Sequence, residues 1–218
     1  MRNIIAILVI ALFTSQLSAQ VPVSQEPLHK KVLENKYIRL LDVWMRPGDT
    51  TQFHIHATPS VFLHFTNNTI GIQVKGQGWV KETNVQGNSS YRSFSPDILV
   101  HRVSNVDTVP FHVTDIELLS SFDPKTTLSP LPFNVLYDNE RVIAYRLTKS
   151  SLTKNIISGR GPLIAELAGG NEVIFHDINA KTSTTIKTGK YVYIEPGASF
   201  YLTAPAGGEI NMVLFEIK

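Results

Sequence analysis

The sequence predicts an all-β fold, because short apolar runs recur along it between clear turn signals. The runs are rich in Val, Ile, Phe, Tyr and Thr, and no convincing long amphipathic helix appears after Val21. Many short strands separated by Gly, Pro, Asn and Ser are typical of a sandwich or barrel. We expect strands at residues 38–44, 61–66, 70–74, 79–83, 112–119, 142–147, 163–167, 172–178, 191–194 and 210–217.

Turn and linker signals divide the chain further. Residues 76–78 and 86–88 each contain glycine between two predicted strands, which favours hairpin turns. Three prolines crowd residues 121–133 and mark a connection between two halves of similar size. We therefore expect an N-terminal domain at residues 20–122, a linker at 123–133 and a C-terminal domain at 134–218.

The composition supports a globular protein and excludes some classes of partner. Hydrophobic residues make up 43% of the chain and charged residues 17%, which is enough apolar material for a substantial core. The formal net charge is only +2, and the basic residues are scattered, so a nucleic-acid interface is not expected. There is no cysteine, which rules out disulfides and thiolate metal sites.

The first nineteen residues have the pattern of a secretory signal peptide. Arg2 precedes an almost unbroken apolar run at residues 4–13, and small and polar residues follow up to Ala19. The run is short for a membrane span. A buried N-terminal helix is the alternative interpretation. We expect cleavage near Ala19 and a secreted or periplasmic protein with no membrane span after cleavage.

The two halves look like copies of one unit. Three anchors recur in register, which makes an internal duplication the simplest explanation. The matched pairs are residues 32–38 with 135–142, 60–65 with 162–167, and 95–101 with 195–201.

Three histidines of the first half form a candidate metal site. His54 and His56 stand two residues apart in an extended run, so their side chains project to the same face of a strand. His101 lies in a second apolar run about forty-five residues later. Buried without a partner they would be costly, whereas exposed on a rim they could be accidental. Three converging imidazoles can hold a divalent metal ion.

These histidines and their surroundings resemble the two motifs of the cupins, a superfamily of jelly-roll β-barrels. In the first cupin motif about five residues separate a glycine from His-x-His, as residues 49–53 separate Gly48 from His54 and His56. The second has Pro-x-Gly-x-x-His-x-x-x-Asn.

In this chain Pro96, His101 and Asn105 match the second motif, whereas Ile98 replaces its glycine. The resemblance implies a two-domain bicupin in which His54, His56 and His101 bind one metal ion.

One departure from the cupin pattern concerns a carboxylate ligand. The glutamate expected four or five residues after His56 is missing, and Ser60 and Val61 stand there. The resemblance then implies a three-histidine site. His64 is a possible fourth ligand, or else a core histidine bonded to the backbone.

A second departure lies in the C-terminal copy, which has no metal ligands. The anchors match His54 with Ile156, His56 with Ser158 and His101 with Tyr201. That half is expected to be structural or an interface. It could also enclose an apolar pocket edged by tyrosines 191, 193 and 201.

Function is left open between an enzyme and a binding protein. Three neutral ligands would leave a divalent ion (Fe, Zn, Mn or Ni) its full charge, which favours anionic or chelating small molecules. With iron the expected chemistry is a dioxygenase, and with the other metals a Lewis-acid isomerisation or hydrolysis. Lys81, Tyr91 and Arg92 could contact an anion or be plain surface residues. The alternatives are a non-catalytic small-ligand-binding protein and an interaction module, and a homodimer is plausible.

Overall fold

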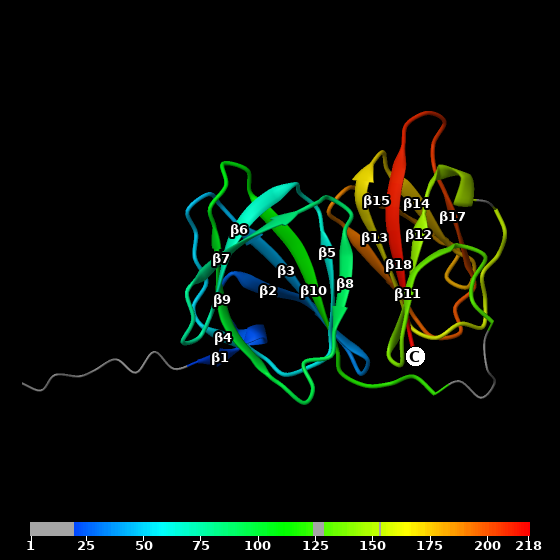
Figure 1. Cartoon of the computed structure of the whole chain (residues 1–218). Helices are drawn as coiled ribbons and strands as arrows, with labels where there is room; N and C mark the ends of the chain where they lie inside the picture. Colours follow the sequence, from blue (N-terminus) through cyan, green and yellow to red (C-terminus); the bar gives the residue numbers. More distant parts are fainter. Residues whose placement is uncertain (1–19, 124–128, 153) are drawn as a thin grey trace, which may run out of the picture.

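The computed structural model describes residues 20–123, 129–152 and 154–218, and they form two β-barrels side by side (Figure 1). The expected signal peptide at residues 1–19 lies outside the described residues. In the described part of the chain, no helix is long and apolar enough to cross a membrane. The elements of the first barrel are β1 (Val21–Pro22), the 3-10 helix η1 (Val23–Gln25), β2 (His29–Glu34), β3 (Ile38–Met45), β4 (His54–His56), β5 (Ser60–His64), β6 (Asn68–Val74), β7 (Trp79–Asn84), β8 (Ser89–Arg92), β9 (Leu99–Asn105) and β10 (Phe111–Leu118).

The second barrel repeats this arrangement with fewer strands. Its elements are β11 (Asn134–Asp138), β12 (Val142–Leu147), the 3-10 helix η2 (Lys149–Ser151), β13 (Leu163–Gly170), β14 (Val173–Asp177), β15 (Thr182–Ile186), β16 (Tyr191–Ile194), β17 (Phe200–Thr203) and β18 (Ile210–Ile217). The all-β prediction is confirmed, and three predicted strands (β12, β16 and β18) match to the residue.

Each barrel consists of two sheets. In the first barrel the strand orders are β1-β4-β9-β6-β7 and β2-β3-β10-β5-β8, and in the second they are β11-β12-β18-β13-β16 and β15-β14-β17. The turn after β6 is the predicted hairpin, because β6 pairs with β7 and Gly76 adopts a φ of 82°. The second hairpin prediction is wrong. The turn at Gly87 is tight, but it carries the chain from β7 in one sheet to β8 in the other.

The two barrels pack against each other through one sheet of each. Alternate residues of β3, β5 and β10 point out of the first barrel, and alternate residues of β12, β13 and β18 meet them. The shared apolar cluster contains Ile38, Leu40, Val61, Leu63, Phe65, Ile116, Leu118, Val142, Ala144, Ile164, Ala168, Val213, Phe215 and Ile217. As a result β10 is buried on both faces, including its polar residues His112, Thr114, Asp115 and Glu117.

A polar cluster lies within this apolar interface. The Thr114 hydroxyl donates a hydrogen bond of 2.9 Å to Glu166 Oε2, and His112 Nε2 lies 2.8 Å from Asp42 Oδ1. Glu166 is fully buried, and its Oε1 has no hydrogen-bond partner among the described residues. Burial, with the nearby charge of Asp42, raises the pKa of Glu166 to about 8.

We predict that Glu166→Gln makes the free energy of unfolding less dependent on pH. The Glu166 carboxyl keeps its proton in the folded protein up to about pH 8, but it loses the proton near pH 4.5 once exposed. Wild-type stability should therefore fall as the pH rises through this window, by at least about 2 kcal/mol between pH 5.5 and 8.5. Asp42, Tyr137 and Tyr191 face the same carboxyl and are unchanged in the variant. Urea denaturation at both pH values measures the effect, and an equal stability difference between the two proteins at both would contradict it.

Candidate metal centre

The pairing of β4 with β9 brings His54, His56 and His101 together. The two strands are antiparallel, and His54 lies directly opposite His101. Opposed residues of antiparallel strands share a face, and so do residues two apart on one strand, so all three imidazoles point into the first barrel. One ligand nitrogen from each histidine lies within 4.8 Å of the other two. The predicted cluster is therefore present in space.

Burial keeps these imidazoles neutral, and several of their nitrogen atoms have no hydrogen-bond partner among the described residues. Burial lowers the pKa of His54 to about 4 and that of His101 to about 3, and it lowers the pKa of His56 as well. Nε2 of His54 and both ring nitrogens of His101 have no hydrogen-bond partner in the described part of the chain. His54 Nδ1 donates to the carbonyl of Gln52 at 2.9 Å, which leaves the lone pair on Nε2. Neutral imidazoles with a free lone pair are the form that binds a metal.

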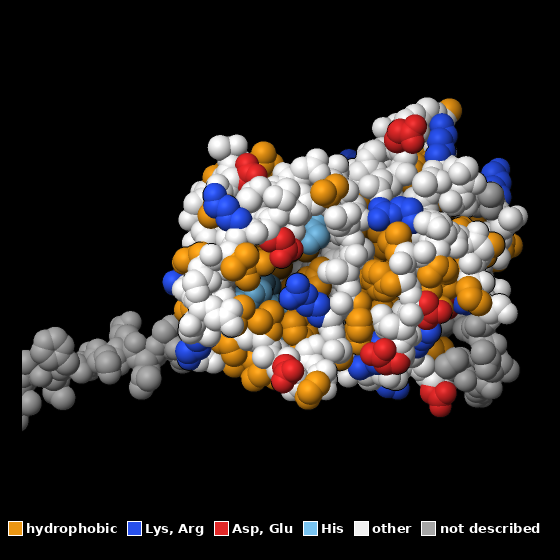
Figure 2. Space-filling model, viewed as in Figure 1, with side chains coloured by type: hydrophobic (Ala, Val, Ile, Leu, Met, Phe, Trp, Pro, Cys, Tyr) orange, Lys and Arg blue, Asp and Glu red, His pale blue; other side chains and the backbone are white. Residues whose placement is uncertain are grey.

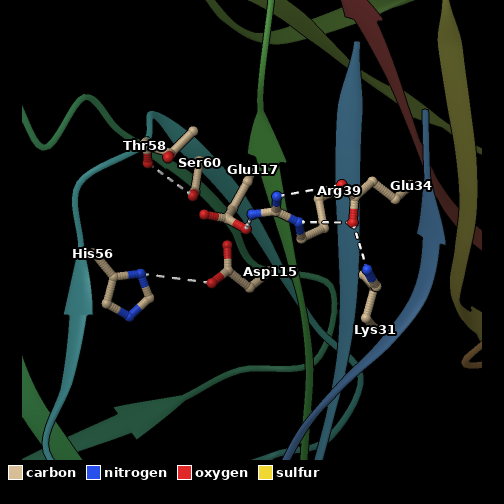
Figure 3. Close-up of polar contacts among 8 residues, drawn as sticks. All are labelled: Lys31, Glu34, Arg39, His56, Thr58, Ser60, Asp115 and Glu117. Carbon is tan, nitrogen blue, oxygen red and sulfur yellow. Dashed lines mark hydrogen bonds and ion pairs between the residues drawn. The ribbon is translucent and has the colours of Figure 1, made fainter. Parts of the chain in front are cut away.

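Asp115 on β10 stands behind His56, as Figure 3 shows. Its Oδ2 lies 3.6 Å from His56 Nδ1, slightly beyond hydrogen-bond distance. Neither carboxylate oxygen has a hydrogen-bond partner among the described residues. Burial, with the charge of Glu117, raises the pKa of Asp115 to about 8. A carboxylate behind the outer nitrogen of a metal-binding histidine orients the ring and increases its basicity.

Glu117 is on the same face of β10 but is already engaged. Arg39 Nη1 donates to Glu117 at 2.7 Å, and Arg39 also contacts Glu34 (Figure 3). Arg39 therefore neutralises Glu117, whereas no lysine or arginine among the described residues forms an ion pair with Asp115.

A second buried carboxylate supports the ring next to His54. His29 lies against His54 with ring centroids 4.7 Å apart, and its Nδ1 donates to Glu26 Oε2 at 2.8 Å. Glu26 also accepts hydrogen bonds from the backbone of Leu28 and Gln52. Gln52 thus links this carboxylate to the carbonyl that orients His54.

The three histidines line one wall of a cavity of about 150 Å³ inside the first barrel. The mouth of the cavity is bordered by the two edge strands β7 and β8, which contribute Glu82, Ser90 and Arg92. Figure 2 shows histidine side chains at the surface of this barrel, among apolar and charged groups. Apolar side chains cover most of the wall, namely Val43, Met45, Phe62, Ile70, Ile72, Val74, Phe94, Leu99, Val103, Phe111 and Val113.

His64 lines the same cavity but is not part of the three-histidine group. It is on β5, opposite Val113, with its ring centroid 5.9 Å from that of Phe111. Its Nδ1 has no hydrogen-bond partner among the described residues, and burial lowers its pKa to about 4. The structure therefore supports a group of three nitrogen donors, with His64 as a neutral wall residue.

The second barrel has apolar side chains at the corresponding positions. Ile157 bridges to Phe200 as His54 pairs with His101, and Phe200 is buried in the core of that barrel. The predicted matches of His54 with Ile156 and of His101 with Tyr201 are thus each wrong by one residue, and a slip of one residue moves a side chain to the other face of a strand. Tyr201 instead stacks on His176, with ring centroids 4.3 Å apart.

The predicted tyrosine-edged pocket is not what the structure shows. Tyr191 and Tyr193 pack against the cluster between the barrels, whereas Tyr201 lies on β17 beside His176. The interior of the second barrel is filled by buried side chains that include Tyr145, Phe200 and Met212.

Several residues of this site were not singled out from the sequence. Asp115 had a weak signal, since it interrupts an apolar strand on the face shared by Phe111 and Val113. His29 had none, because only the pairing of β2 with β3 brings it to the cavity, and Glu26 had none because it reaches the site through its bond to His29.

We predict that Asp115→Asn weakens metal binding about tenfold, because the His56 ring loses its carboxylate partner. Competition between the protein and a chelator for Zn²⁺ measures the affinity. Glu117→Gln, on the same strand face but bonded to Arg39, is the matched control and should keep the wild-type value. Equal affinities for wild type and Asp115→Asn would contradict this role.

Comparisons with known proteins identify the fold. No protein-family model matches the chain, and no curated protein matches it by sequence. Solved structures do match. The protein YlbA from Escherichia coli has a TM-score of 0.58 at 10% identity, covering 86% of each chain. AerE from Microcystis aeruginosa has a TM-score of 0.56 at 10% identity and covers 88% of this chain and 98% of its own.

Two further matches carry cupin or metal descriptions. A cupin 2 conserved barrel domain protein from Leptotrichia buccalis has a TM-score of 0.54 at 11% identity and covers 86% of this chain and 87% of its own. Oxalate decarboxylase from Bacillus subtilis, described with Mn(II) centres, has a TM-score of 0.50 at 8% identity and covers 84% of this chain and 69% of its own. Identities this low establish the fold alone, and on that evidence the chain has the fold of the cupin superfamily, as two barrels in tandem.

Proposed function

We propose that this protein is a mononuclear metal-binding bicupin whose metal ion is held by His54, His56 and His101. The observation that carries the proposal is the convergence of three neutral imidazoles, whose buried nitrogens include one or more in each ring without a partner among the described residues. We propose further that the protein acts outside the cytoplasm, in the periplasm or as a secreted protein, on the strength of the residues preceding Gln20.

The energetic argument favours a metal over a purely structural role. Each buried polar nitrogen left without a partner costs about 1–3 kcal/mol, so several of them in one place would be a substantial loss. In the described part of the chain, polar contacts satisfy only one nitrogen of the cluster, since His54 Nδ1 is bonded to Gln52, whereas His56 Nδ1 lies 3.6 Å from Asp115 without a hydrogen bond. A divalent ion would satisfy one nitrogen of each of the three rings together.

The donor set fits several ions. Imidazole ligands suit Fe, Zn and Ni, and the manganese described for the similar oxalate decarboxylase adds Mn. A metal ion so bound supplies Lewis acidity and lowers the pKa of a bound water. The chain itself contributes neutral ligands, a buried carboxylate behind His56 and a mostly apolar cavity that limits the entry of water.

These features support a small-molecule metalloenzyme of the oxidoreductase or isomerase type. The second candidate is a non-catalytic binding protein, which the mostly apolar cavity of about 150 Å³ also favours. Turnover of a substrate distinguishes the two, whereas metal content tests both together.

The metal proposal predicts near-stoichiometric metal in residues 20–218 purified without a histidine tag, and almost none in His54→Ala/His56→Ala. Elemental analysis measures this directly after incubation with Fe(II), Zn(II), Mn(II) or Ni(II). Added metal should also raise the melting temperature of the wild type and leave that of the double variant unchanged.

His176→Ala is the matched control, because His176 bonds Ser183 and Thr203 in the second barrel, far from the cavity lining. It should retain full metal content. Absence of metal from the wild type after all four incubations would refute the proposed function.

A further inference from the structure

We propose that Arg92 forms an anion subsite beside the metal centre, so that the ligand of this cavity is a small carboxylate with an apolar body. The inference rests on the proposed function, because it takes the cavity as the ligand-binding site, but it concerns Arg92 and not the three metal-binding histidines.

The position of Arg92 follows from strand register. Arg92 at the end of β8 lies opposite Ser60 at the start of β5, so both side chains are on the same face of the sheet. That face points into the barrel, because Phe62 and His64 of β5 line the cavity whereas Val61 and Leu63 belong to the interface cluster.

The pairing of Ser60 with Arg92 places a positive charge beside the three histidines, where the cupin motif has a negative one. Ser60 stands where the cupin motif has an acidic ligand, and its hydroxyl is bonded to the carbonyl of Thr58. A neutral residue thus replaces a negative one, with a cation next to it. Asp115 is buried behind His56. The exposed Glu82 also lines the cavity, but it is on β7 of the other sheet and forms no ion pair with Arg92 among the described residues.

The guanidinium of Arg92 is also unpaired. None of the hydrogen bonds or ion pairs found among the described residues involves it, although Arg39 and Arg160 are both paired with carboxylates. Arg92 is the only lysine or arginine among the cavity-lining residues that the structure describes.

The other two side chains considered from the sequence are occupied elsewhere or directed away. The Tyr91 hydroxyl donates to Glu140 at 2.7 Å, across to the second barrel. Lys81 alternates with Glu82 on β7, and only Glu82 lines the cavity. Arg92 is thus the single cation positioned for an anion entering between β7 and β8.

The size and lining of the cavity define the rest of the ligand. A cavity of about 150 Å³ admits a body of roughly six non-hydrogen atoms, the size of benzene. Phe62 and Phe94 lie near His56, with ring centroids 6.1 and 4.9 Å from it. They favour an apolar chain, while a planar guanidinium favours a carboxylate.

The test compares butanoate with butanamide, which has the same shape and no charge. Calorimetric titrations use wild type, Arg92→Met and the control Lys81→Met, each without metal and loaded with Zn²⁺. We expect metal-free wild type to bind butanoate about tenfold more tightly than butanamide, and less so at high salt. Arg92→Met should lose this preference at unchanged metal content, and Lys81→Met should retain it.

The outcomes separate this inference from the proposed function. Equal, or equally undetectable, binding of the two compounds by metal-free wild type would overturn the Arg92 subsite. A preference seen only with Zn²⁺ and retained in Arg92→Met would also overturn it, because the metal would then hold the carboxylate. A preference that depends on Arg92 in a protein that binds no metal would support the subsite and refute the metal centre.

Discussion

The first barrel is built around one unusual arrangement, three imidazoles side by side with buried nitrogens that have no hydrogen-bond partner in the described part of the chain. Hydrophobic burial drives the fold, but it penalises polar atoms without partners. His54, His56 and His101 are placed there by strand alternation and by the pairing of β4 with β9. The neighbouring groups follow from this arrangement, since Gln52 and Asp115 each face the outer nitrogen of one ring and leave its inner nitrogen free.

The two barrels show what the same architecture does without these histidines. In the second barrel Ile157 and Phe200 replace one histidine pair, and Phe200 packs with Tyr145 and Met212 in a filled core. In the first barrel the side chains leave a cavity, and its mouth lies between β7 and β8. The face-to-face sheets join the filled barrel to the hollow one, so β10 presents Asp115 to the cavity and Ile116 to the interface.

The order of neighbouring residues predicted much of this structure, because the alternation of side chains between the two faces of a strand can be read from adjacent positions. It gave the β class, three strands to the residue, and the shared face of His54 and His56. Pairing between distant strands could not be read in the same way. The proximity of Asp115 to His56, of His29 to His54 and of Arg92 to Ser60 depends on register, which one sequence does not contain. The same limit explains why Tyr201 was matched to His101 instead of Phe200, since one residue of slip reverses the face.

The central claim is that His54, His56 and His101 bind one metal ion, and anomalous diffraction from metal-loaded crystals tests it most directly. Data collected on both sides of the metal absorption edge locate the ion independently of any assumed ligand. The account predicts a single strong peak among the three imidazoles, within coordination distance of a nitrogen of each. A peak at another place in the chain, or no peak in a protein with intact His54, His56 and His101, would contradict it.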